Sequence, residues 1–200
     1  MKAQILESFG INLGRVRNLL SNYTTITGAG SGRRATEDTD LLRAAVVFLH
    51  ATLEEVLREL ERWKLPGAPQ DQLKNVPLKG LSQTGRAEKF WLSDLATFRG
   101  QGVDQVIAES IDEMLDRSNY NDLGDVSRVL ALAGVNDVAV DAAKARLAPA
   151  MARRHKIVHQ ADRQDQPGKG FGPATPIDKP TVSDWIDDVE HFVTEVFKHL

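Results

Sequence analysis

Residues 42–54 of this 200-residue chain read LRAAVVFLHATLE and carry its clearest helical pattern. Apolar side chains recur there at every third or fourth position, which places them along one face of an α-helix. The stripe continues past the quoted stretch and consists of Leu42, Val46, Leu49, Leu53, Val56 and Leu60. We therefore predict a long helix, capped by Asp38 or Thr39 and running to about Leu65.

Three polar residues form a second line on the same predicted helix. Arg43, His50 and Glu54 are spaced so that their side chains return to nearly the same helix face. Two interpretations stay open at this point. The line is either a solvated flank that contains one ion pair, or the wall of a cleft.

The other apolar patterns in the chain also have helical spacing, and no alternation typical of a strand is present. Pro149 predicts a kink or a helix restart just before the basic segment that follows it. Thr181 or Ser183 is the predicted cap of the last helix. The further helices are predicted over residues 2–24, 87–98, 103–115, 122–133 and 136–147, after Pro149, and over 181–200. We expect a single all-α domain over residues 1–200, a bundle of six or seven helices with an irregular connection over 66–87 and a loop over 166–179.

Composition restricts the chemistry and the cellular setting. The chain has no cysteine, so disulfides, cysteine ligands and a cysteine nucleophile are excluded. The longest apolar run, residues 44–49, is far shorter than the ~20 residues of a membrane helix. The N-terminus lacks the apolar core of a secretory signal. We expect a cytoplasmic protein without a membrane partner.

Charge is distributed unevenly along the chain. The net charge is only −3, but residues 144–163 hold six Lys or Arg against one Asp, whereas residues 181–200 hold five acids against one Lys. A local excess of positive charge can steer an anionic ligand even when the total is near neutral. The glycine-rich stretch 27–34, TGAGSGRR, lacks the preceding strand and the Gly-Lys-Ser/Thr ending of a phosphate loop. We interpret that stretch as a linker.

The basic stretch 153–159, RRHKIVH, is the strongest candidate for chemistry. His155 and His159 have the spacing of two zinc ligands on one helix face, but no third ligand is near and the neighbours are cations. A second interpretation is a solvated basic face with two incidental histidines. The third is metal-free cleavage of RNA, which needs a base, an acid and cations that stabilise the phosphorane.

The spacing within this stretch bears on assembly. Histidine titrates near pH 6.5 and arginine binds phosphate in a bidentate fork, so both suit RNA cleavage. Arg154 and His159 are, however, about 140° apart around a helix and do not point the same way. Either the long arginine side chain bridges this angle, or two copies of the helix meet across a two-fold axis and pool their groups. The second arrangement predicts a homodimer.

These residues also resemble a known family. Arg154 to His159 (RHKIVH) is similar to the Arg, polar residue, three residues, His signature of the HEPN superfamily of all-α ribonucleases. Residues 42–54 and 120–134 resemble helices of its RiboL-PSP or MAE-type members. The resemblance implies a metal-independent endoribonuclease that acts as a dimer without a cofactor, commonly a toxin, an antiviral factor or an RNA-processing factor.

The resemblance also implies roles for individual residues. Arg154 and His159 would be the catalytic pair, with His159 as general base or acid, and His155 would support them. We further expect a set of basic residues to contact RNA: Arg153, Lys156 and Arg163. Arg43, His50 and Glu54 would then support the site or form the wall of its cleft. The alternative function is a non-catalytic helical module that binds RNA or pairs with a toxin or antitoxin, and an antitoxin or other regulatory protein is a possible partner of either form.

Overall fold

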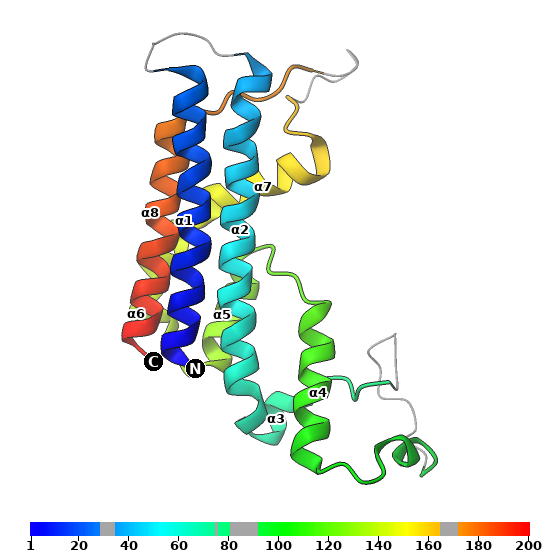
Figure 1. Ribbon diagram of the computed structural model, residues 1–200. Coiled ribbons are helices and arrows are strands. Elements are labelled where there is room, and N and C mark those ends of the chain that lie inside the picture. Colours follow the sequence, from blue (N-terminus) through cyan, green and yellow to red (C-terminus); the bar gives the residue numbers. More distant parts are fainter. Residues whose placement is uncertain (29–34, 75, 81–91, 165–171) are drawn as a thin grey trace.

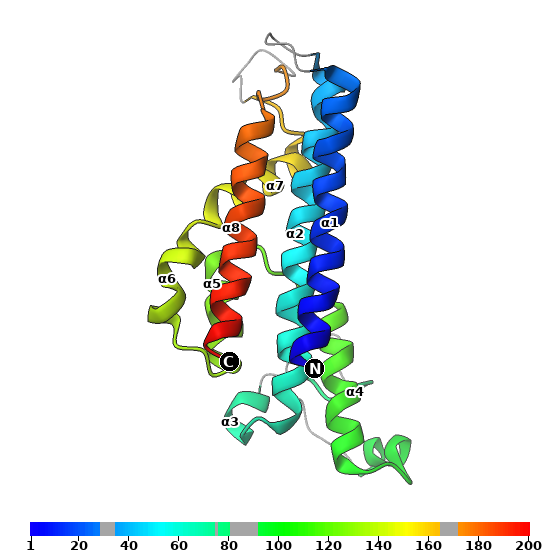
Figure 2. The same cartoon turned by 60° about the vertical axis from the view of Figure 1, so that its left-hand side comes forward.

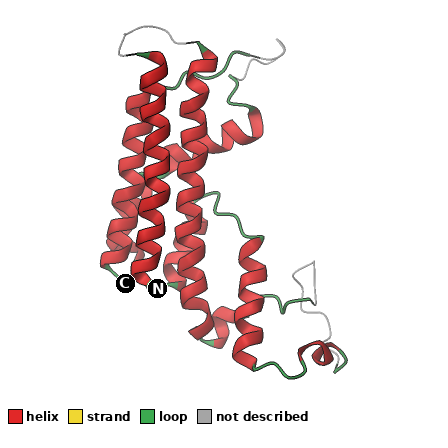
Figure 3. Cartoon of the chain, viewed as in Figure 1, coloured by secondary structure: helices red, strands yellow, loops and turns green. Residues whose placement is uncertain are grey.

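The computed structural model describes residues 1–28, 35–74, 76–80, 92–164 and 172–200. These residues form helices joined by loops, without a β-strand among them, as Figure 3 shows. The predicted all-α class is therefore confirmed. The α-helices are α1 (Lys2–Thr27), α2 (Thr36–Lys64), α3 (Gln70–Leu73), α4 (Val103–Asp116), α5 (Leu123–Leu132), α6 (Asp137–Ala145), α7 (Ala148–Gln160) and α8 (Lys179–Lys198). This described part of the chain has slightly more helices than the six or seven expected, because α3 is a single turn within the connection predicted to be irregular.

The long helices α1, α2 and α8 run alongside one another, and the shorter α5, α6 and α7 lie on the other side of this layer (Figures 1 and 2). The two termini lie beside each other, where α1 begins and α8 ends, and α3 and α4 extend beyond them (Figures 1 and 2). There the ammonium group of Lys2 donates a hydrogen bond to the carbonyl of Phe197 at 2.5 Å. The first and last helices are thus joined at their ends as well as along their lengths.

The main hydrophobic core lies between these helices and confirms the stripe predicted on α2. All six stripe residues, Leu42, Val46, Leu49, Leu53, Val56 and Leu60, are buried. The core also takes its side chains from α1, α5, α6, α7 and α8. Burial of each large aliphatic side chain contributes about 1.5–3 kcal/mol, so this shared core is what positions α7 against α2.

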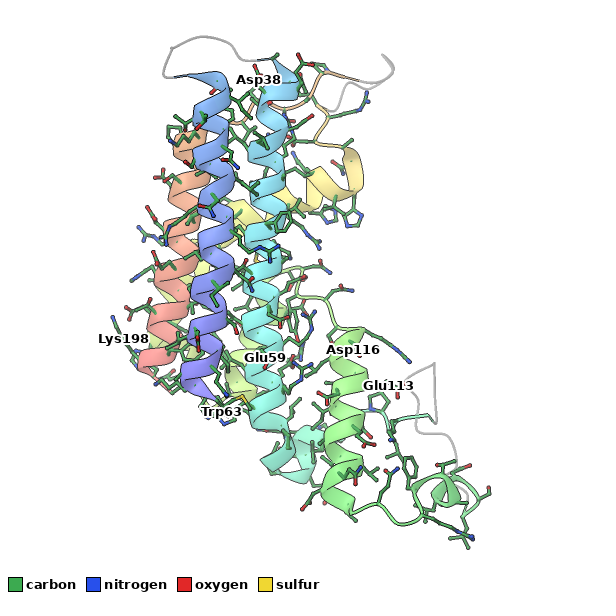
Figure 4. The ribbon with its side chains drawn as sticks, in the orientation of Figure 1. Asp38, Glu59, Trp63, Glu113, Asp116 and Lys198 are labelled. Carbon is green, nitrogen blue, oxygen red and sulfur yellow. The ribbon has the colours of Figure 1, made fainter. Side chains whose placement is uncertain are left out.

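A second, smaller hydrophobic cluster lies at the far end of α2. Its buried members are Leu65, Ile111 and Leu115, and the side chains of α3 and α4 pack around them. Leu65 opens the 3-10 helix η1 (Leu65–Gly67). Arg62 donates to Asp112 at 2.7 Å and joins α2 to α4. Figure 4 shows α4 beside the part of α2 that carries Glu59 and Trp63.

The predicted caps of α2 and α8 are wrong. The helix α2 begins at Thr36, with Ala35 as its N-cap. Thr39 therefore lies inside the first turns and does not cap the helix, and its hydroxyl donates to the Thr36 carbonyl. The helix α8 begins at Lys179, and the Asp178 carboxylate accepts from the Thr181 N–H at 2.8 Å. A proline in the first helical turn loses no hydrogen bond, which is why Pro180 does not delay the start of α8.

Other predicted boundaries are confirmed. Asn136 caps α6, and Gly134 has a φ of 74° just after the end of α5. The restart predicted at Pro149 occurs, because α7 begins at Ala148 with Pro149 in its first turn. The first part of the stretch predicted as a helix over 87–98 lies outside the described residues, which omit 87–91. In the described part, Asp94–Phe98 forms the 3-10 helix η2 and not an α-helix.

The linker predicted over 27–34 and the loop predicted over 166–179 lie partly outside the described residues, which omit 29–34 and 165–171. Residues 172–178 contain no helix, and α8 begins at Lys179, the last residue of the predicted loop. Within the described part of the chain, no helix combines the length and the apolar character needed to cross a bilayer.

Candidate active site

The helix α7 carries the basic stretch and packs against α2. It passes behind α2 in the view of Figure 1, and Figure 4 shows that it meets α2 between the levels of Asp38 and Glu59. Met151 anchors its buried face in the main core. The backbone turns at the end of α7 through Ala161 and Asp162, whose φ values are 48° and 55°. Left-handed backbone is unfavourable for residues other than glycine, so this turn needs support from tertiary contacts.

Asp162 supplies that support through a buried ion cluster. Its carboxylate is fully buried and accepts from Arg43 Nε at 2.7 Å and from an Arg153 amino group at 2.8 Å. Both arginines also donate to the carbonyl of Thr175, each at 2.8 Å. The cluster therefore joins α2, the end of α7 and the segment that leads into α8.

These contacts settle the position of Arg43. Its side chain is buried and also donates to Thr39 Oγ1 at 2.7 Å. The interpretation of Arg43 as part of a solvated flank is wrong, because its side chain is buried. Its expected role in supporting the site or forming the wall of a cleft stays a prediction. Arg153 is only 15% exposed and is held in the same cluster. Its contacts are those of a structural anchor, and its expected contact with RNA stays a prediction.

The other two residues of the polar line on α2, His50 and Glu54, lie near the basic stretch on α7. His50 is buried, and its Nε2 lies 3.2 Å from Glu54 Oε1. The same oxygen accepts from the Tyr120 N–H at 3.4 Å and lies 3.9 Å from an amino group of Arg154. Burial alone would raise the pKa of Glu54, but His50, the Tyr120 N–H and the Arg154 charge together lower that pKa below its ordinary value. Glu54 is therefore an ionised partner beside Arg154.

The side chain of Arg154, on α7, reaches α2 and the connection from α4 to α5. One of its amino groups donates to Asn121 Oδ1 at 3.0 Å. Its side chain is 17% exposed, and its Nε is buried without a hydrogen-bond partner. The guanidinium is thus held by an amide oxygen and a nearby carboxylate, and only part of it is open to a ligand.

The two histidines of the stretch lie on the outside of α7. His155 and His159 are exposed, and their ring centroids are 4.7 Å apart with the planes tilted by 45°. Lys156 and Arg163 are also exposed. This face therefore presents two imidazoles together with cationic side chains, which is a suitable set for proton transfer beside a phosphate.

The structure brings the predicted residues together in two groups. Arg154 contacts Glu54 and Asn121, while His155 contacts His159. The described hydrogen bonds and ion pairs do not join Arg154 to His159. In the described part of the chain, no three His, Asp or Glu side chains gather where they could hold a metal ion. The third ligand that a zinc site at the two histidines would require is therefore absent from this part.

Sequence reasoning missed three contributors to the site. The sequence could have indicated Asp162, because it is the single acidic residue in the basic segment 144–163. No feature of the sequence predicted the role of Asn121, because its contact with Arg154 joins residues that are 33 positions apart. The third is the buried pair of Tyr120 and Glu61, in which the Tyr120 hydroxyl donates to Glu61 Oε2 at 2.5 Å. Burial, aided by the Glu61 carboxylate, raises the pKa of Tyr120 far above its ordinary value, so the hydroxyl stays a donor.

The described residues form an all-α fold in which the helix that carries Arg154 and His159, α7, packs against the long helix α2. The family model described as RiboL-PSP-HEPN matches residues 12–200, which is nearly the whole chain. The chain therefore belongs to the RiboL-PSP-HEPN family, and the resemblance predicted from its sequence is confirmed. No curated protein and no solved structure matches it.

Proposed function

We propose that this protein is a metal-independent endoribonuclease. The observation that carries the proposal is the composition of α7, which presents the exposed pair His155 and His159 beside a guanidinium, Arg154, held in place by two other elements. Membership of a HEPN family supports a ribonuclease-type activity. The lack of cysteine leaves histidine as the side chain suited to proton transfer near neutral pH.

The reaction that suits these groups is attack within the RNA backbone. A base removes the proton of a ribose 2′-hydroxyl, and the 2′-oxygen then forms a bond to the adjacent phosphorus. The bond from phosphorus to the 5′-oxygen breaks, and an acid protonates that leaving oxygen. The products are a 2′,3′-cyclic phosphate and a 5′-hydroxyl. His159 would serve as the base or the acid, His155 would support it, and Arg154 would stabilise the phosphorane charge.

The site would be completed by a second copy of the chain. Arg154 points toward α2 and the α4–α5 connection, whereas His159 lies on the exposed face of α7. A two-fold arrangement would bring Arg154 of one copy and His159 of the other to the same phosphate. Val158 on α7 and Phe48 on α2 are 48% and 46% exposed, and such apolar side chains would be covered in a dimer. Lys156, Arg163 and Arg153 would contact the RNA backbone.

A nuclease of this kind would serve as a toxin, an antiviral factor or an RNA-processing factor, with an antitoxin or another regulatory protein as a partner. The alternative is a non-catalytic RNA-binding or toxin–antitoxin module. The small exposed fraction of Arg154 favours that alternative, because a guanidinium occupied within its own subunit is less available to a phosphate.

The proposal predicts that the purified protein cuts RNA equally well with and without EDTA. The measurement is gel analysis of end-labelled RNA, followed by phosphatase treatment that distinguishes 2′,3′-cyclic phosphate ends from open ones. Cleavage that EDTA abolishes would point to a metal-dependent hydrolase instead. RNA binding without any fragments would favour the non-catalytic module.

A further inference from the structure

The connection between α4 and α5 reaches the basic stretch through one side chain. Asn121 is exposed, and its Oδ1 accepts from the Arg154 guanidinium at 3.0 Å. Both groups are polar, and Asn121 lies at the surface, so hydrophobic packing does not explain the contact. A neutral amide oxygen adds no negative charge beside the arginine, whereas a second carboxylate in the same place would offset its charge further than Glu54 does.

The backbone that carries Asn121 is fixed from one side by the first turn of α5. The Asn121 N–H donates to Asp125 Oδ2 at 2.9 Å. Asp122, the N-cap of α5, accepts from the Asp125 N–H at 3.0 Å. These reciprocal bonds satisfy donors at the helix start and hold residues 121 and 122 in one conformation.

The preceding residue fixes the same backbone from the other side. Tyr120 is fully buried, and its hydroxyl binds the buried carboxylate of Glu61 on α2 at 2.5 Å. Its N–H donates to Glu54 Oε1, the oxygen that also lies near Arg154. Asn121 is therefore presented from a short segment that is anchored to α2 and to α5 at once.

We propose that Asn121 is a positioning residue, which sets the direction of the Arg154 guanidinium for the reaction. The inference rests on the proposed ribonuclease function of Arg154. Glu54 lies 3.9 Å from the guanidinium and supplies charge without a short hydrogen bond, and the Arg154 Nε has no partner. The hydrogen bond to Asn121 Oδ1, at 3.0 Å, is therefore the shorter of the two polar contacts that orient the guanidinium. A donor fixed before the reaction stabilises developing charge better than one that must be ordered during it.

The kinetic test compares Asn121→Ala with Asn119→Ala, which removes the same type of exposed side chain two positions earlier in the same connection. We expect Asn121→Ala to lower kcat about tenfold while KM changes less than about twofold, because a misdirected arginine affects the transition state more than binding. Asn119→Ala should behave as wild type. Equal kcat for the two variants would overturn the proposal. A rise in kcat or a fall in KM for Asn121→Ala would also overturn it, since Asn121 would then compete with the substrate.

A second measurement does not depend on catalysis. In nitrogen-15 NMR spectra, the Nε–Hε signal of Arg154 is identified by its loss in Arg154→Ala. Its heteronuclear NOE is expected to fall in Asn121→Ala and to stay unchanged in Asn119→Ala, because only the first variant frees the guanidinium. An unchanged NOE in both variants would contradict the positioning role. If wild-type protein cuts no RNA, the ribonuclease proposal fails separately, and the NOE still shows whether Asn121 holds Arg154.

Discussion

Replacing His159 with alanine is expected to lower the rate of RNA cleavage by about 10²–10⁴-fold, because the reaction loses a general acid or base. The His159 side chain is exposed, so its removal leaves the core intact. The measurement is the initial rate of RNA cleavage in EDTA, accompanied by circular dichroism to show that helix content is unchanged.

His191→Ala is the matched control for this prediction. His191 is also an exposed histidine on a helix, but it lies on α8 and its nearest acidic partner is Glu195, at 3.9 Å. The His191→Ala protein should cut RNA at the wild-type rate. A His159→Ala protein that is folded and fully active would remove His159 from the proposed site.

Replacing Asp162 with alanine is expected to have the largest effect on stability. The change leaves Arg153 without its carboxylate partner in a mostly buried cluster, and it leaves Arg43 with only the exposed carboxylate of Asp40, at 3.1 Å. Loss of one partner from a buried ion pair destabilises a protein by about 3–5 kcal/mol. The end of α7 would also lose the contacts that hold its left-handed turn. Urea unfolding followed by circular dichroism measures the free energy of unfolding.

Two further variants separate charge from shape in this prediction. Asp162→Asn keeps the size of the side chain and removes its charge, so it should lose much of the same free energy. Asp184→Ala removes an exposed carboxylate on α8 and should change stability by less than about 0.5 kcal/mol. A free energy of unfolding for Asp162→Ala within about 1 kcal/mol of wild type would show that the cluster does not stabilise the fold.

Periodicity predicts which residues share a helix face but not what covers that face. The apolar stripe of α2 was predictable because six aliphatic side chains on one face can only be stable when buried. The burial of the polar line beside it was not predictable. Arg43 is buried with partners, the Asp162 carboxylate and the Thr175 carbonyl, that come from distant parts of the chain. Polar burial depends on long-range partners, and a single sequence does not pair them.

The candidate site shows the same division. The spacing of His155 and His159 correctly predicts two imidazoles on one face, and their rings lie close together. The partners of Arg154 depend on tertiary structure: the packing of α7 against α2 brings Glu54 near it, and the anchored connection brings Asn121. The angle between Arg154 and His159 follows from helix geometry alone, and it is the basis for proposing a site shared by two subunits.

The most direct test of that shared site uses dimers made from one Arg154→Ala subunit and one His159→Ala subunit, isolated with two different affinity tags. If Arg154 of one subunit works with His159 of the other, such a mixed dimer has one intact site. It should cut RNA in EDTA at about half the wild-type rate, while each variant alone is inactive. Mixed dimers as inactive as the two parent variants would contradict a site composed from both subunits.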